Sequence, residues 1–280
     1  MTGSRTLGLA VLALIAWFAA SVLHAQENPN ARVVFPSSVQ QGSMVVGKVP
    51  PGSSVRYAGR TLRVTPYGSV VFGVGRDEKG PVSVDVSGPD GTKQPVTVQV
   101  TPRDWPVQHI KGVPSAMVNP PPATAKRIAR ENGQIVGARR GDTDEVGFAQ
   151  AFIWPVTGRI SGRFGNQRVY NGTPKSPHSG MDIAAGAGTP IRAPAAGTIT
   201  LSQPDFYLTG GTVMIDHGHG ISSNFLHMSR LDVKVGDVVK QGDVVGAVGS
   251  TGRSTGPHLH WGMTWFDVKI DPLLVLERGK

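Results

Sequence analysis

The stretch Gly256-Pro257-His258-Leu259-His260-Trp261, near the C-terminus, is the most informative part of the chain. Taken as an extended strand, it places residues i and i+2 on the same face, so His258 and His260 are expected to face one site. Two imidazoles aimed at one point suggest a metal. Because histidine is also a routine polar residue of strands, the pair alone leaves the metal site and an ordinary half-buried strand equally open.

A third histidine lies upstream in Pro177-His178-Ser179-Gly180-Met181-Asp182, where the carboxylate of Asp182 follows His178 at a spacing of four. A catalytic zinc takes three protein ligands of N or O type and leaves a fourth position open for water. His178, Asp182 and one member of the His258/His260 pair would supply that set. The other member would then lie beside the metal-activated water, where a general base belongs.

Further blocks surround these residues in a fixed order: Gly165 and 171–172 ahead of 178–182, then 188–197, 225–228, 235–242 and 249–260. Together they resemble the lysostaphin/LytM family of zinc endopeptidases, which cut the peptide part of peptidoglycan. The resemblance covers residues 155–272. It implies an exported endopeptidase that hydrolyses cross-links or stem peptides of peptidoglycan, with a two-sheet β core and the metal at the floor of a groove.

The resemblance also implies a role for each histidine of the site. His178, Asp182 and His260 would hold one zinc ion, and His227 and His258 would be the two catalytic histidines. Zinc would polarise the scissile carbonyl and acidify its bound water. His258 is then the candidate base, and His227 the candidate donor to the tetrahedral intermediate or the leaving group. Met228 stands where the family usually has Leu, a near-isosteric change.

The groove walls are expected in three segments, 167–175, 204–210 and 250–256. Asn171, Tyr207 and Arg192 are the candidate substrate-binding residues, although Arg192 is equally explained as a structural residue of the 188–197 block. His217 and His219 also have ligand-like spacing, but they fall in the Gly-rich turn Asp216-His217-Gly218-His219-Gly220 and are expected to be structural. His109 and His24 are not site candidates.

The N-terminus resembles a secretory signal peptide. Arg5 precedes a largely apolar run over 6–23, and Ala25 is a plausible cleavage point. The alternative is a retained membrane anchor, because the run approaches the roughly 17-residue minimum for a spanning helix. Cleavage would leave no stable membrane span and an exported protein of the periplasm or cell envelope. The chain has no cysteine, so it must be stabilised by its core, and thiol catalysis is excluded.

The chain is basic, with 28 Lys+Arg against 19 Asp+Glu and a formal net charge of +9. Residues 1–25 contain one charged residue, Arg5. Without them the chain has 27 Lys+Arg against 19 Asp+Glu, a net charge of +8. Such a charge favours contact with anionic envelope polymers as well as peptidoglycan. No nucleic-acid motif is present, so no nucleic-acid partner is expected.

The chain is expected to be all-β. Short Val-rich runs between 31 and 101, with a hairpin signal at Gly88-Pro89-Asp90-Gly91-Thr92, favour an immunoglobulin-like β-sandwich. Proline clusters and a short basic helix, capped by Thr124 and ended by Gly133, mark a linker. The expected segments are a signal peptide at 1–25, a β-rich domain at 26–104, a linker at 105–150 and a zinc endopeptidase domain at 151–280.

Two other functions compete with the zinc endopeptidase. A non-catalytic wall-binding or hydrolase-activating module of the same fold is the main alternative, but such modules lack ligands and here all five positions are filled. A cupin-like iron oxygenase also uses His-x-His with a carboxylate. It is disfavoured because the blocks at 188–197 and 235–242 have no role in it.

Overall fold

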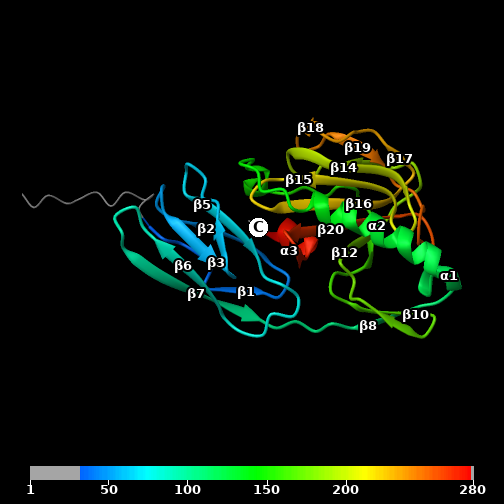
Figure 1. Cartoon of the computed structure of the whole chain (residues 1–280), viewed down its shortest axis with the longest axis horizontal. Helices are drawn as coiled ribbons and strands as arrows, with labels where there is room; N and C mark the ends of the chain where they lie inside the picture. Colours follow the sequence, from blue (N-terminus) through cyan, green and yellow to red (C-terminus); the bar gives the residue numbers. More distant parts are fainter. Residues whose placement is uncertain (1–31, 279–280) are drawn as a thin grey trace, which may run out of the picture.

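The computed structural model describes residues 32–278, so the signal-peptide prediction for 1–25 falls outside the described residues. Within this range the protein is mostly β, as the sequence predicts. Figure 1 shows the N-terminal sheets at one end, the large C-terminal sheet at the other, and the short helix α3 between them. No helix in the described part is long and apolar enough to cross a membrane.

The N-terminal region forms a five-stranded sheet in the order β1-β7-β6-β3-β4 and a two-stranded sheet of β2 and β5. The strands are β1 (Ser38–Gln40), β2 (Met44–Lys48), β3 (Ser54–Tyr57), β4 (Arg60–Leu62), β5 (Ser69–Gly73), β6 (Val82–Ser87) and β7 (Lys93–Thr101). In β6 the valines are buried and the residues between them exposed, the two-residue period of a half-buried strand. The immunoglobulin-like arrangement stays a prediction, because the second sheet has only two strands.

The segment between the two regions contains β8 (Val107–Ile110), α1 (Ser115–Val118), α2 (Pro122–Ala138) and the 3₁₀ helix η2 (Gly147–Ala149). Two features differ from the sequence expectation. β8 pairs in parallel with β10 of the C-terminal domain, so this stretch is part of the folded structure. Helix α2 also continues through Gly133. The cost of a glycine in a helix, about 1 kcal/mol, is offset because Ile135 packs on Leu201, Phe206 and Met214.

The C-terminal domain is built on an eight-stranded sheet in the order β18-β14-β15-β16-β20-β12-β9, with β21 paired to β20. Two three-stranded sheets flank it, β13-β19-β17 and β11-β10-β8. The elements are β9 (Arg159–Gly162), β10 (Gln167–Tyr170), β11 (Thr173–Lys175), β12 (Gly180–Ala184), β13 (Pro190–Arg192), β14 (Gly197–Phe206), β15 (Gly210–Asp216), β16 (Ile221–Met228), β17 (Arg230–Leu231), β18 (Val238–Val239), β19 (Val244–Ala247), β20 (His258–Trp265), β21 (Val268–Ile270) and α3 (Pro272–Glu277).

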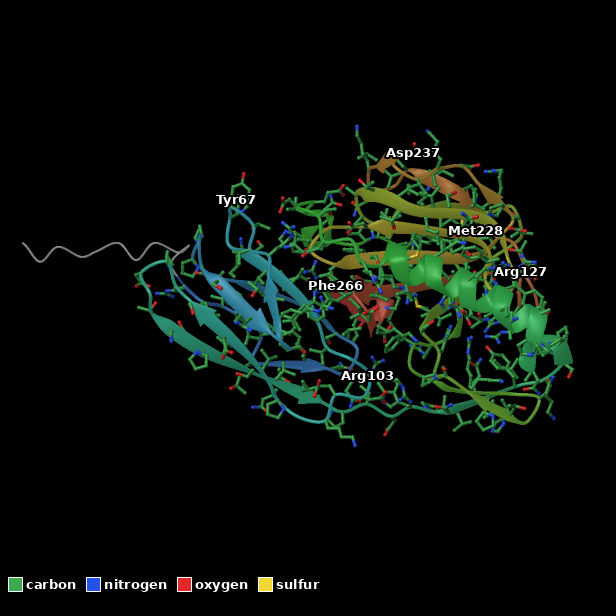
Figure 2. All side chains as sticks on the ribbon, viewed as in Figure 1. Tyr67, Arg103, Arg127, Met228, Asp237 and Phe266 are labelled. Carbon is green, nitrogen blue, oxygen red and sulfur yellow. The ribbon has the colours of Figure 1, made fainter. Side chains whose placement is uncertain are left out.

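The two regions share one hydrophobic core. The rings of Tyr57 and Trp265 lie 5.6 Å apart between centroids, and a Cβ at Gly73 would lie 2.8 Å from the Cβ of Trp265. Arg103 also bridges the regions through an ion pair of 2.9 Å with the buried Asp271. In Figure 2, Arg103 and Phe266 both lie where the two regions meet. The N-terminal sheets are therefore packed against the C-terminal domain.

His217 illustrates how burial fixes a neutral histidine in this core. Its Nδ1 donates to the carbonyl of Ala196 (2.7 Å), and its Nε2 lies 2.8 Å from the hydroxyl of Ser223. Both nitrogens are thereby satisfied without a second ring proton. Because burial penalises the charged ring, the pKa of His217 is lowered from 6.5 to about 4. The structural role expected for this residue agrees with its position.

We expect His217 to make folding stability pH-dependent. Between pH 6.5 and 4 the histidine is protonated in the unfolded chain but stays neutral in the folded protein. The contribution of His217 to stability is therefore fully present above pH 6.5 and is lost as the pH falls. This residue should lower the free energy of unfolding by roughly 2 kcal/mol between pH 7 and pH 5, measured by urea denaturation. His217→Asn should remove that part of the difference, whereas His109→Asn, at an exposed position, should keep it. An unchanged pH dependence in His217→Asn would contradict the prediction.

Candidate metal centre

The site is assembled by the pairing of two neighbouring strands. β12 and β20 are antiparallel, with Asp182 directly opposite His260 and Ala184 opposite His258. Directly opposed residues share a face of the sheet, and so do residues two apart in one strand. His258 and His260 therefore face the same site as Asp182, as their spacing predicts. His178 lies just before β12 and reaches the same point.

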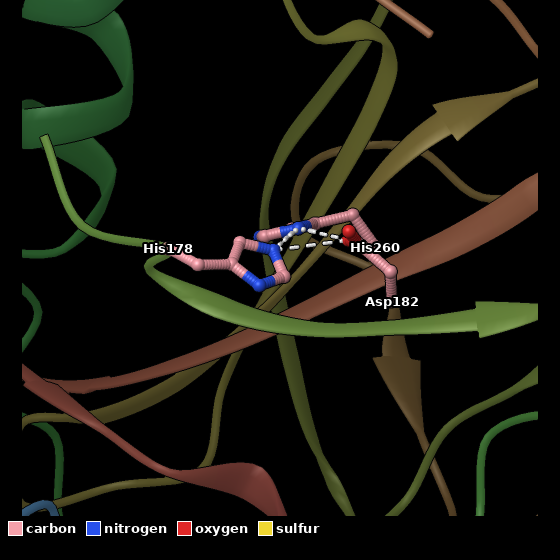
Figure 3. Close-up of side chains that lie close together, drawn as sticks. All are labelled: His178, Asp182 and His260. Carbon is pink, nitrogen blue, oxygen red and sulfur yellow. Dashed lines mark hydrogen bonds and ion pairs between the residues drawn. The ribbon is translucent and has the colours of Figure 1, made fainter. Parts of the chain in front are cut away.

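Three side-chain atoms converge at this point (Figure 3). His178 Nε2 lies 3.0 Å from Asp182 Oδ1 and 3.0 Å from His260 Nδ1, and His260 Nδ1 lies 2.8 Å from Asp182 Oδ1. All three residues are buried, and their ligand atoms lie within 4.8 Å of one another. Atoms bound tetrahedrally to zinc at about 2.0–2.1 Å would lie roughly 3.4 Å apart, so small shifts would accommodate the ion.

The protonation states suit metal ligands. His178 Nδ1 donates to the carbonyl of Arg163 (2.9 Å), which leaves the lone pair on Nε2. Burial opposes the charge on Asp182, but the hydrogen bonds and charges of His178 and His260 lower its pKa well below 3.8. Burial lowers the pKa of His260 to about 4. At neutral pH Asp182 is thus a carboxylate and His260 a neutral imidazole, the forms that bind zinc.

His227 and His258 lie beside this cluster, with their ring centroids 4.9 Å apart. His258 Nδ1 lies 2.8 Å from the carbonyl of Gly256, and its Nε2 lies 3.8 Å from Asp182 Oδ1. His227 Nδ1 lies 2.8 Å from the carbonyl of Thr251. A carbonyl can only accept, so both rings carry a hydrogen on Nδ1 and present Nε2 for chemistry. The structure thus brings all five predicted chemical residues together.

The backbone of His227 has a left-handed conformation, with φ of +64°. This region is sparsely populated for residues other than glycine and is tolerated where surrounding contacts hold it. Here the amide of His227 donates to the carbonyl of Thr209 (2.8 Å), and its ring is held by Thr251. Burial, followed by the charges of His260 and His258, lowers the pKa of His227 to about 3. The ring is therefore neutral and fixed in direction.

Two hollows adjoin the cluster, of about 460 Å³ and 390 Å³. Both are lined by Arg168, Tyr170, His227 and Arg253, so these four residues stand where the hollows meet. Together the two hollows form one groove past the metal centre. We refer to it below as the groove.

The three predicted substrate-binding residues do not line the groove. Asn171 donates through its amide to the carbonyl of Val113 (2.6 Å), the backbone of Tyr207 is held by Glu131, and Arg192 donates to the carbonyl of Gly242. Each of these contacts holds a loop or strand in place. Substrate contact by these three residues therefore stays a prediction, and the lining of the groove does not include them.

Arg168 is a site residue that the sequence reasoning missed. Its Nη2 lies 2.5 Å from Asp182 Oδ2, and its Nη1 donates to the hydroxyl of Tyr170 (3.1 Å). A Cβ at Gly162 would lie 2.5 Å from the same carboxylate oxygen, so only glycine leaves room for this ion pair. Arg168 fixes Oδ2 and directs Oδ1 at the metal position. The two-residue spacing of Arg168 and Tyr170 in a strand was the available signal.

A carboxylate and two imidazoles at the floor of a groove, beside two further histidines, define a metallopeptidase-type centre. Residues 176–272 match the family model described as peptidase family M23. A crystal structure described as a peptidase M23 from Pseudomonas aeruginosa is 33% identical, with a TM-score of 0.65 over 84% of this chain and 94% of that one. The chain belongs to peptidase family M23, which confirms the resemblance carried by its motifs.

Two curated relatives carry more specific names. The peptidoglycan DD-endopeptidase ShyA of Vibrio cholerae is 36% identical over 126 residues, which cover 44% of this chain and 28% of that protein. The DD-carboxypeptidase/endopeptidase Mpg of Neisseria meningitidis is 48% identical over 85 residues, covering 30% and 19%. The chain thus spans less than a third of the length of either relative.

We predict that Arg168→Gln weakens zinc binding by about 10- to 100-fold, because Asp182 loses the partner that orients it. The measurement is competition for zinc with a chromogenic chelator at fixed pH. Arg192→Gln removes the same charge outside the groove and should bind zinc as the unaltered protein does. Wild-type zinc affinity in a folded Arg168→Gln protein would rule out this orienting role.

Proposed function

We propose that the chain is an exported zinc-dependent endopeptidase that hydrolyses peptide cross-links or stem peptides of peptidoglycan. The observation that carries the proposal is the convergence of His178, Asp182 and His260 beside two further histidines, His227 and His258, at the floor of the groove. The names of the relatives support the substrate class, and a wall substrate would require export to the periplasm or cell envelope.

The donor set favours zinc. Two imidazoles and one carboxylate are the N and O ligands of catalytic zinc sites, which keep a position open. When bound, zinc supplies a Lewis acid that acidifies water and polarises the scissile carbonyl. Arg168 belongs to this machinery because it holds the second oxygen of Asp182. The non-catalytic alternative has no support in the structure, since no ligand or catalytic histidine is missing.

His258 is the proposed general base. Its Nδ1–H donates to the carbonyl of Gly256, so the lone pair of Nε2 faces the centre and can take a proton from the attacking water. The water oxygen then bonds to the carbonyl carbon. When the carbon–nitrogen bond breaks, the same proton returns from Nε2 to the leaving amine. One residue thus serves as base and then as acid.

His227 is the proposed stabiliser of developing negative charge, and its geometry sets a condition on that role. With Nδ1–H held by the carbonyl of Thr251, a neutral ring presents only a lone pair at Nε2. In the resting state His227 can therefore accept a hydrogen bond from the attacking water. It donates to the oxyanion only after it has itself gained a proton. The depressed pKa, about 3, makes that state short-lived.

The decisive experiment is digestion of purified peptidoglycan, with the fragments identified by mass spectrometry. We expect the zinc-loaded protein to release peptides cut at an internal bond, chelation to stop release, and added zinc to restore it. His258→Ala should keep zinc at one ion per chain and lose at least about 100-fold in rate. Lys240→Ala, at an exposed position outside the groove, should retain activity. Intact peptidoglycan after incubation with the zinc-loaded protein would refute the proposal.

A further inference from the structure

The groove is lined by an excess of positive charge. Arg168 and Arg253 line both hollows. The larger hollow adds Lys111, and the smaller one adds Lys175 and Lys269. The lining contains one acidic residue, Asp182, which belongs to the metal centre and is already paired with Arg168. Clefts lined by one sign of charge focus the field and attract ligands of the opposite sign.

The remaining four cations are not neutralised by acidic partners. Among residues 32–278 no salt bridge joins Lys111, Lys175, Arg253 or Lys269 to a carboxylate. Lys175 donates to the carbonyl of Val118 (2.7 Å) and Arg253 to that of Met117 (3.3 Å). Both acceptors are neutral, so the positive charges persist. Outside the groove, by contrast, Arg230 and Lys234 of the C-terminal domain are each paired with an acid, Asp232 and Asp237.

Arg253 is also held in a defined position. Its guanidinium lies over the ring of Tyr170, 4.7 Å from the centroid, while Nη1 is tied to Met117. Tyr170 in turn receives a hydrogen bond from Arg168, which contacts the metal ligand Asp182. A guanidinium fixed in this way loses little freedom when it binds a carboxylate, and its planar fork can bind both oxygens. Arg253 therefore offers a preorganised anion contact beside the metal centre.

We propose that the groove selects anionic peptides, with free carboxylates on the residues flanking the scissile bond, and that Lys111, Lys175 and Arg253 attract and bind them. This inference rests on the proposed function, because it assigns a substrate class to the same site. It separates two kinds of wall peptide. A stem peptide that carries free carboxylates complements the groove, whereas a neutral glycine bridge has nothing to pair with its charges.

The test compares two synthetic cross-linked peptides that differ only at the flanking carboxylates, which are free in one and converted to primary amides in the other. We expect kcat/KM of the zinc-loaded protein to be at least 10-fold higher for the free carboxylates. The advantage should shrink as sodium chloride is raised to about 1 M, where the screening length is about 3 Å. Equal kcat/KM for the two peptides at low salt would overturn the inference.

Variants assign the effect to the groove. Lys111→Gln and Arg253→Gln, alone and combined, should lower kcat/KM for the carboxylate peptide and leave that for the amide unchanged, while Arg253→Lys should restore part of the loss. Lys240→Gln removes the same charge at an exposed position outside the groove and should behave as wild type. A loss of the same size for both peptides would show that the changed residues only support the groove wall, and would also overturn the inference.

Binding separates this inference from the proposed function. Calorimetric titration of both peptides into zinc-loaded His258→Ala, which keeps the three ligands, reports recognition without turnover. Tighter binding of the carboxylate peptide with no cleavage by the wild type would support anionic selection and refute the endopeptidase. Cleavage of both peptides with equal binding would retain the endopeptidase and refute the selection.

Discussion

The register between β12 and β20 is the constraint on which the site depends. It sets Asp182 opposite His260, and the two-residue period then brings His258 to the same face. A slip of one residue would turn every one of these side chains to the other face of the sheet. The register is secured by burial, because Met181, Ile183, Leu259 and Trp261 fill the core on the opposite face. One face of the β12–β20 pair therefore packs in the core, and the other face carries the residues of the site.

Burial also sets the chemistry of the polar face. It disfavours the charged forms of His260 and His227, which keeps these two rings neutral at pH values where free histidine begins to be protonated. The same burial would neutralise Asp182, yet its hydrogen bonds to His178 and His260, together with Arg168, keep it ionised. One environment thus yields neutral imidazoles and an ionised carboxylate, and the specific partners rather than the burial make the difference.

The sequence identified residues that the structure brings together at the candidate metal centre, but it did not indicate which side chains line the groove. His258, His260, His178 and Asp182 are found through short spacings and through motif blocks that the chain carries in order, and these fix backbone positions. Asn171, Tyr207 and Arg192 were chosen as polar or aromatic residues near the expected groove walls, a criterion that says nothing of side-chain direction. Arg168 was missed because its ion pair with Asp182 joins β10 to β12, two strands of different sheets. The space for this ion pair is left by Gly162, which lies in a third strand, β9.

The same contrast applies to the supposed linker. Its prolines stay out of helix interiors and central strands, since Pro122 is the first residue of α2. However, β8 needs only an edge position, and β10 offers one (Figure 1). Residues of β8 thereby line the groove. No local pattern signals this, because the partner strand lies in the following domain. The pairing of β8 with β10, far along the chain, therefore determines the structure of this segment.

Chemistry and selectivity consequently occupy different stretches of the chain. The segment that matches the peptidase family, 176–272, contains all three proposed ligands and both proposed catalytic histidines. Lys111, Arg168, Tyr170 and Lys175 come before it, and they reach the groove because β8, β10 and β11 form one small sheet beside the centre. Changes in that sheet would alter the charge and shape of the groove without moving a ligand. A common hydrolytic centre can in this way be adapted to a particular peptide by the residues that precede it.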